Sequence, residues 1–167
     1  MIVDSFRYLP RSFRPLYEGR GPYRGEEEPV WAPFVKRLAE SRIALLTSAG
    51  LYVRGSQEPF DLDAERARPE WGDPSWRAIP ADASADLRVA HLHINDEDLL
   101  ADPEIVLPRG LLTTLAEEGV IGSSVAEHVA VMGYQDRNLR DWHSTTAPAI
   151  ASFLQAEGAD GVVLAPA

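Results

Sequence analysis

Cysteine is absent from all 167 residues of the chain. The protein can therefore form no disulfide, and it offers neither a thiolate metal ligand nor a thiol nucleophile. No apolar run approaches the roughly 20 residues that a membrane helix needs, and the amino terminus lacks the apolar core of a signal peptide. These absences predict a cytoplasmic protein with no membrane partner.

Positive charge is also scarce, since 16 Lys and Arg residues stand against 26 Asp and Glu residues, a formal net charge of -10. Such a chain is repelled by phosphate backbones, so we expect no nucleic-acid partner. The three-glycine dinucleotide pattern and the phosphate-loop lysine are missing as well, and nucleotide binding is unsupported. The 45% hydrophobic content is that of a globular protein with a core, and the length fits one domain.

Residues 1–30 are predicted to form an irregular N-terminal arm, because prolines and glycines interrupt every part of this segment. Its first 25 residues hold five arginines against Asp4 and Glu18. This local positive charge could meet an acidic partner or an anionic ligand, or the arm could simply be solvated. The predicted α/β domain spans residues 31–167.

Periodicity and turn residues divide this domain into alternating helices and strands. The fold class that follows is α/β, with a doubly wound, mostly parallel sheet in a flavodoxin- or Rossmann-like three-layer arrangement. The elements expected are a helix at 31–40, a strand at 42–47, a long loop at 54–86, a strand at 87–94, a helix at 109–118, a strand at 125–132, a helix capped by Ser144 or Thr145 and running to about residue 157, and a strand at 161–165.

Ligands of such sheets bind beyond the carboxyl ends of the strands. Those ends are predicted at residues 48–50, 93–96, 132–133 and 166–167. The last strand finishes two residues before the chain does. A domain can end on a strand, so whether the sheet is complete stays open.

Two histidines, His91 and His93, are expected on one face of the second strand, because side chains alternate along a strand. With a nearby carboxylate they could bind zinc or iron. They could also form hydrogen bonds to a ligand or a loop, or be structural. His128 alone on the third strand is more typical of a core or rim histidine than of a ligand.

Small residues end the first strand, and Ser48 and Gly50 could let backbone amides approach a carboxylate. The loop at 72–80 has mixed chemistry, with Asp73, Ser75 and Arg77 close together. Arg77 could form a bidentate pair with a substrate carboxylate. It could equally pair with Asp73 inside the protein.

Several segments, taken in order, resemble the glycine/sarcosine/betaine/D-proline reductase family of selenoprotein B type. The resemblance covers about residues 30–167, and no single segment carries it alone. The segments are residues 42–50, 58–61, 72–80, 91–93, 104–108, 119–122, 132–133 and 161–167.

This resemblance implies an oxidoreductase, or the substrate-binding part of one, that reductively cleaves a small amino acid or a derivative of it. The family's redox residue is a selenocysteine or cysteine that follows a final apolar strand, which implies a position just after Ala167 and none within this chain. A selenocysteine codon translated as a stop would produce this pattern. The implied partners are an amino-acid-like substrate and either partner reductase subunits or a thiol electron donor.

The resemblance also assigns roles to the candidate residues. His91 and His93 are the expected catalytic groups, active in proton transfer, and no metal is expected. The expected substrate-binding residues are Ser48, Gly50, Asp73, Ser75, Arg77 and His128.

Two other functions remain open at this point. One is a non-catalytic binding or regulatory module with the same fold, since fold alone does not decide function. The other is a metal-dependent hydrolase built on His91, His93, His128 and an acidic residue, which metal analysis of the purified protein would test.

Overall fold

The structure is a computed structural model that describes residues 32–68, 71–82, 85–92, 94–133, 135 and 139–167, together with Pro15. The chain divides into two units, Met1–Pro33 and Phe34–Ala167. Apart from Pro15, the predicted arm at 1–30 lies outside the described residues, so its irregular character stays a prediction. The second unit holds every element discussed below.

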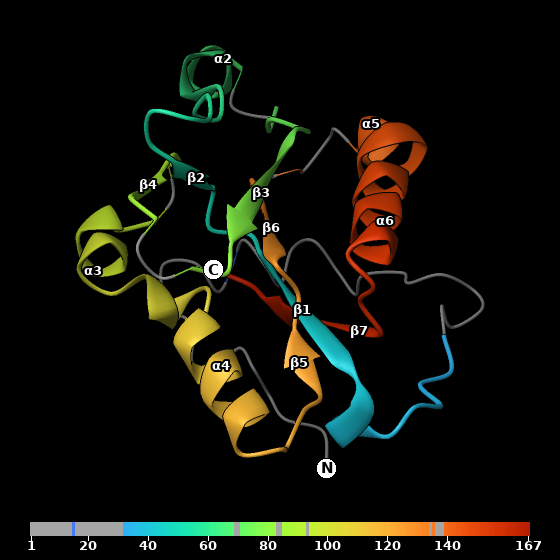
Figure 1. Ribbon diagram of the computed structural model, residues 1–167. Helices are drawn as coiled ribbons and strands as arrows, with labels where there is room; N and C mark the ends of the chain where they lie inside the picture. The colour runs from blue at the N-terminus through green and yellow to red at the C-terminus, as the bar shows by residue number, and fades with distance from the viewer. Residues whose placement is uncertain are drawn as a thin grey trace. The chain divides into compact units, whose positions relative to one another are not determined.

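A mostly parallel sheet forms the centre of this unit (Figure 1). Strand β1 (Arg42–Thr47) lies in its middle and runs parallel to β5 (Ser123–Ser124), β6 (Glu127–Val131) and β7 (Gly161–Ala165). Strand β3 (Trp76–Pro80) is antiparallel to β6. Because β7 pairs along β1 from Ile43 to Thr47, β5 and β6 must share the opposite edge of β1, one after the other.

Helices cover both faces of the sheet, which gives the predicted three-layer α/β fold. Side chains alternate along β1, so Ile43 and Leu45 pack on one face and Ala44 on the other. The first face lies against α4 (Arg109–Glu117) and α3 (Asp96–Ala101), through Leu112 and Leu99. The second face lies against α6 (Ala147–Ala156). Figure 1 shows α4 and α6 on opposite sides of the sheet.

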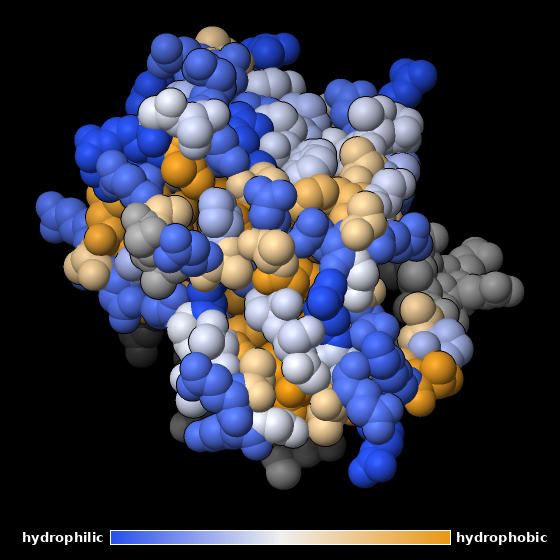
Figure 2. All heavy atoms as spheres, viewed as in Figure 1, coloured by the Kyte–Doolittle hydropathy of each residue, from blue (hydrophilic) through white to orange (hydrophobic). Residues whose placement is uncertain are grey.

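Shorter elements complete the unit. A second, two-stranded sheet pairs β2 (Leu51–Val53) antiparallel with β4 (Leu87–Val89). The remaining helical segments are η2 (Leu38–Glu40), α2 (Leu62–Ala67), η3 (Pro103–Ile105), α5 (Leu139–Asp141) and the π-helical segment η4 (Trp142–Thr146). In the face seen in Figure 2, hydrophilic residues cover α2, and hydrophobic surface gathers in the middle of the view.

Four elements agree with the sequence prediction. Strands β1 and β7 have the predicted bounds, and helix α4 ends one residue before the predicted end. Gly119 follows it with φ 72°, in the left-handed conformation that terminates a helix. Strand β6 is shorter than the predicted 125–132 but lies within it.

The helix predicted at 31–40 is wrong for residues 32–37, which are not helical, and only η2 remains. The apolar residues that suggested it bury no continuous face, since Phe34, Val35 and Leu38 are all exposed. A short helix without a buried apolar face does not offset the cost of its nucleation.

The predicted loop at 54–86 contains two elements that periodicity did not indicate. Helix α2 begins at the Asp61 cap, whose carboxylate accepts a hydrogen bond from the Ala64 N–H at 2.8 Å. Strand β3 lies at an edge of the sheet, with only Ile79 fully buried. An edge strand with one buried residue has no alternating pattern to read.

The strand predicted at 87–94 is wrong in length and in place. Strand β4 ends at Val89 and pairs with β2, outside the parallel sheet. After it, the Ala90 N–H donates to the Gly50 carbonyl at 2.9 Å, and His91 lies beyond the strand. The prediction that His91 and His93 share one face of a strand is therefore wrong for His91, which is not in a strand. His93 lies outside the described residues.

The predicted Ser144 or Thr145 cap is also wrong. The helical segment begins at Leu139 and passes through η4 into α6 without a side-chain cap at Thr146. A π-helical segment has no sequence signature of its own, and such segments often occur at functional sites.

Candidate functional site

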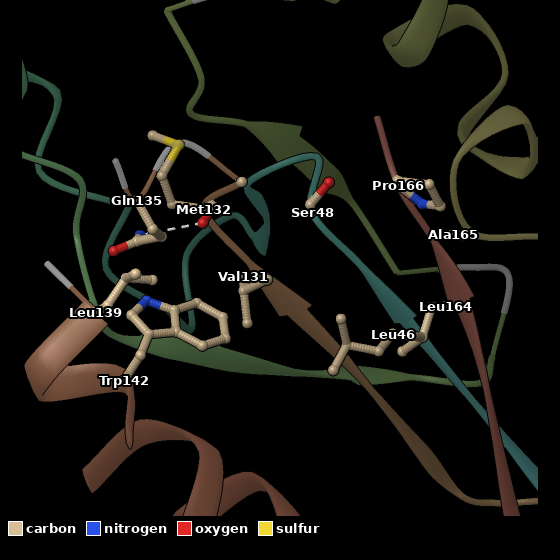
Figure 3. Close-up of a pocket in the computed structure, with 11 residues that line it drawn as sticks. Leu46, Ser48, Val131, Met132, Gln135, Leu139, Trp142, Leu164, Ala165 and Pro166 are labelled. Carbon is tan, nitrogen blue, oxygen red and sulfur yellow. Dashed lines mark hydrogen bonds between the residues drawn. The ribbon is translucent and has the colours of Figure 1, made fainter. Parts of the chain in front are cut away.

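The candidate site is a pocket of about 320 Å³ at the carboxyl ends of β1, β6 and β7 (Figure 3). The pocket opens where ligands bind in parallel sheets of this kind. The described part of its lining is mainly apolar and includes no charged side chain. The lining residues are Leu46, Ser48, Val131, Met132, Gly133, Gln135, Leu139, Trp142, Leu164, Ala165 and Pro166.

Ser48 is the predicted site residue that lies in this pocket. Its Oγ accepts a hydrogen bond from the Ala167 N–H at 2.9 Å, so the residue fixes the chain just beyond β7. The Ser48 O–H has no recorded acceptor among the described residues and remains available as a donor. Gly133 packs against it, since a Cβ at Gly133 would lie 2.9 Å from the Ser48 Cβ.

Gln135 was not identified from the sequence, and it connects the pocket to a neighbouring loop. Its Nε2 donates to the Asp73 carbonyl at 2.7 Å and to the Met132 carbonyl at 3.1 Å. Figure 3 shows the second of these bonds at the pocket wall. A lone glutamine in a segment without periodicity carries no signal that could have singled it out.

Trp142 was also missed, although an aromatic residue just before a predicted helix is a weak signal. The π-helical segment η4 presents it to the pocket. Its Nε1, a donor, and Oε1 of Gln135, an acceptor, are buried and have no hydrogen-bond partner in the described part of the chain. A buried polar atom without a partner costs about 1–3 kcal/mol.

Asp73 and Ser75 lie together in a second pocket of about 440 Å³ beside η4, and their role in substrate binding stays a prediction. Oδ1 of Asp73 accepts from both the N–H and the O–H of Ser75, and its Oδ2 accepts from the Asp61 N–H at 2.9 Å. Thr146 closes the same loop by donating to the Pro74 carbonyl at 2.6 Å. The Asp73 carboxylate thus holds the backbone of the loop in place through hydrogen bonds to Asp61 and Ser75.

Arg77 uses its donors within the protein. Nε donates to the Glu58 carbonyl at 2.8 Å, Nη2 to the Pro59 carbonyl at 3.1 Å, and Nη1 to Ser75 Oγ at 2.8 Å. The guanidinium also stacks 4.3 Å from the centroid of the Phe60 ring. Burial lowers the pKa of Arg77, and Asp73 opposes that shift. Its role toward a substrate carboxylate stays a prediction. The donors of Arg77 contact carbonyls and Ser75, and Ser75 in turn donates to Asp73.

Gly50 is a turn residue between β1 and β2 and lies outside the pocket lining. It has φ 66°, and a Cβ there would lie 2.4 Å from the Ala90 carbonyl oxygen. Its N–H already donates to the Val131 carbonyl at 3.0 Å. His91 lies beside this turn, because its Cβ would be 3.4 Å from a Cβ at Gly50. The catalytic role of His91 stays a prediction, and so does that of His93.

His128 lies in the core, with no exposed surface, and is not among the described residues that line the candidate pocket. Its Nδ1 accepts a hydrogen bond from the Leu45 N–H at 3.2 Å. This bond falls where β5 gives way to β6, so the imidazole replaces a missing backbone partner of β1. Burial, reinforced by the charge of Arg109, lowers the pKa of His128 to about 4. A neutral core histidine fits this geometry better than a substrate ligand.

No group of three or more His, Cys, Asp or Glu residues that could hold a metal occurs among the described residues, which do not include His93. None of the described helices combines the length and apolar character that a membrane span requires.

Comparisons with known proteins identify the family of this chain. The model of the glycine/sarcosine/betaine reductase selenoprotein B family matches residues 23–167. The D-proline reductase subunit gamma of Acetoanaerobium sticklandii is 34% identical over 137 residues, which are 81% of this chain and 52% of the relative. The chain thus spans about half the length of that relative. No solved structure shows a significant match. The chain belongs to the glycine/sarcosine/betaine reductase selenoprotein B family.

Proposed function

We propose that this chain forms the substrate pocket of a reductase component that reductively cleaves a small amino acid or a derivative of it. The pocket at the ends of β1, β6 and β7 holds the substrate. Family membership and the D-proline reductase relative support the reaction class. The choice among such substrates belongs to the proposal as well.

One observation carries the proposal: the end of β7 forms part of the pocket wall. Leu164, Ala165 and Pro166 line the pocket, and Ser48 holds the Ala167 N–H. The family resemblance predicts a redox cysteine or selenocysteine just after Ala167. A residue there would stand at the rim of the pocket, next to any molecule bound within it.

The residues around that position suit such a group. When present, a cysteine or selenocysteine supplies the nucleophilic sulfur or selenium that reductive cleavage requires. The free O–H of Ser48 is a donor close to the Ala167 backbone and can stabilise negative charge there. The apolar side chains of the wall lower the local polarity and so strengthen that interaction.

The two unpaired polar atoms of the wall suit the ends of an amino acid. The carboxylate would accept from Trp142 Nε1, and an N–H of the substrate would donate to Gln135 Oε1. Both atoms are buried, so each side chain must rotate slightly to meet a ligand. Satisfying them would recover part of the cost of their burial. His91 and His93 remain the proposed groups for proton transfer.

Ligand binding to the chain itself tests the proposal. Glycine, sarcosine, betaine and D-proline would be titrated in turn, with isothermal calorimetry and tryptophan emission as readouts, because Trp142 lines the pocket. We expect at least one of the four to bind. Leu164→Phe, which adds bulk to a side chain on the pocket wall, should weaken that binding.

The matched control is Leu111→Phe, an exposed position on α4 that lies outside the pocket lining. This variant should bind as the parent chain does. Absence of binding by all four compounds to the parent chain, or equal binding to Leu164→Phe, would refute the pocket assignment.

A further inference from the structure

Strand β7 has the sequence of an interior strand but lies at an edge of the sheet. Val162, Val163 and Leu164 are consecutive apolar residues that expose 41%, 50% and 67% of their surface. On the neighbouring strand β1, the residues from Ile43 to Leu45 are buried. Parallel strands are normally covered on both faces, whereas apolar side chains on both faces of β7 remain largely exposed.

The outer edge of β7 is also unpaired in the described part of the chain, where β7 pairs with β1 alone. Natural edge strands are protected by charged residues, by proline or by a bulge. The segment Gly161–Ala165 has none of these. It is therefore a ready template for another strand.

A groove beside β7 extends this apolar surface. Its volume is about 360 Å³, and Ile150 and Leu154 of α6 face Val162 and Leu164 of β7 across it. Leu46 of β1 contributes to the groove and is paired in register with Leu164, as Figure 3 shows for these two side chains. Gln155 and Asp160 are the polar or charged residues among those that line it. An occupant must therefore be largely apolar on this side.

We infer that β7 is the docking edge for the half of the family's polypeptide that this chain does not span, which enters as an apolar strand parallel to β7. The matched relative is about twice as long as the region it shares with this chain, so a second half of suitable size exists in the family. The parallel direction is part of the inference and extends the direction that β1, β5, β6 and β7 share.

The added strand would also complete the candidate pocket. Leu164 faces both the groove and the pocket, and Ala165 and Pro166 continue the same strand along the pocket wall. A strand beside them would close the open side of the pocket. This inference rests on β7 and the relative's length, and it stands whether or not the pocket binds an amino acid.

Thiol protection tests the inference, and the absence of native cysteine makes a single introduced cysteine the chain's only thiol. Val163→Cys would be alkylated alone and with an excess of the part of the D-proline reductase subunit gamma outside the matched residues. This fragment would first be shown to be folded by circular dichroism. Peptide mass spectrometry reads the alkylation rate at residue 163. Val120→Cys, at an exposed position outside β7, is the matched control.

We expect the fragment to slow alkylation at residue 163 by at least about tenfold and to leave residue 120 unchanged. A second arm joins the fragment to the chain by a flexible linker, which raises its effective concentration. Equal alkylation of residue 163 in the chain alone and in both arms would overturn the inference. So would protection of residue 163 in a dimer of the chain alone, since a second copy would then occupy this edge.

Discussion

The Leu45 N–H donates a hydrogen bond to Nδ1 of the buried His128 imidazole, across 3.2 Å. Leu45 lies in the middle of β1, between the residues that pair with β5 and those that pair with β6. The His128 imidazole thus takes the place of a backbone acceptor at the point where the pairing of β1 changes from β5 to β6. The bond requires a lone pair on Nδ1, so the imidazole must be neutral.

The first prediction concerns acid stability. The folded state holds the pKa of His128 at about 4, below the ordinary histidine value of 6.5, so between these values the unfolded chain binds a proton that the folded chain does not. The stability contribution is complete above pH 6.5 and declines as the pH falls toward 4, by about 3 kcal/mol in all. Urea denaturation across this range measures it.

The control for this prediction is His128→Asn, which keeps an acceptor near the Leu45 N–H but does not titrate. The parent chain should lose the about 3 kcal/mol relative to this variant as the pH falls. Parallel stability curves for the two proteins would contradict the prediction.

The second prediction compares the cost of adding a side chain at two glycines whose backbone has a positive φ. Gly50→Ala should destabilise the fold by about 3 kcal/mol or more, because its Cβ would collide with the Ala90 carbonyl oxygen in addition to straining the backbone. Gly55→Ala has φ 83° but nothing within 4 Å of its Cβ, so only backbone strain of about 1–2 kcal/mol remains. Denaturant midpoints compare the two. Equal losses would mean that the close approach at Gly50 is unimportant.

A third prediction concerns Arg77. Arg77→Lys should lower the free energy of unfolding by about 1–3 kcal/mol, because an ammonium cannot reach the Glu58 carbonyl, the Pro59 carbonyl and Ser75 Oγ together. Arg54→Ala is the control, since its exposed ion pair with Asp86 is worth less than about 1 kcal/mol. If Arg77→Lys leaves stability intact but weakens binding of the amino acid, Arg77 is a substrate ligand after all.

A fourth prediction concerns Gln135. Gln135→Leu should cost about 1–3 kcal/mol, because the Asp73 and Met132 carbonyls both lose their donor. It should also weaken substrate binding, since the loop at residue 73 is then no longer tied to β6. Thermal denaturation and calorimetry measure the two effects. Gln155→Leu, at an exposed position on α6, should change stability by less than about 0.5 kcal/mol.

The amino-acid sequence by itself determined the buried strands and the helix that covers them. Strands β1 and β7 and helix α4 could be read because burial imposes continuous apolar runs or a helical period on them. The family could also be predicted, because its segments recur in order along the chain. The composition further excluded any thiol from the pocket wall. All of these properties are local or additive along the sequence.

Only the tertiary structure decided which residues meet at the pocket. Gln135 and Trp142 line the pocket but belong to segments without a readable period. His128 lies away from the pocket, where its Nδ1 accepts a hydrogen bond from the Leu45 N–H. Arg77 is occupied by carbonyls from the segment before α2. Contacts between residues distant in sequence depend on how strands pair and where turns place them. Local pattern carries no information about that choice.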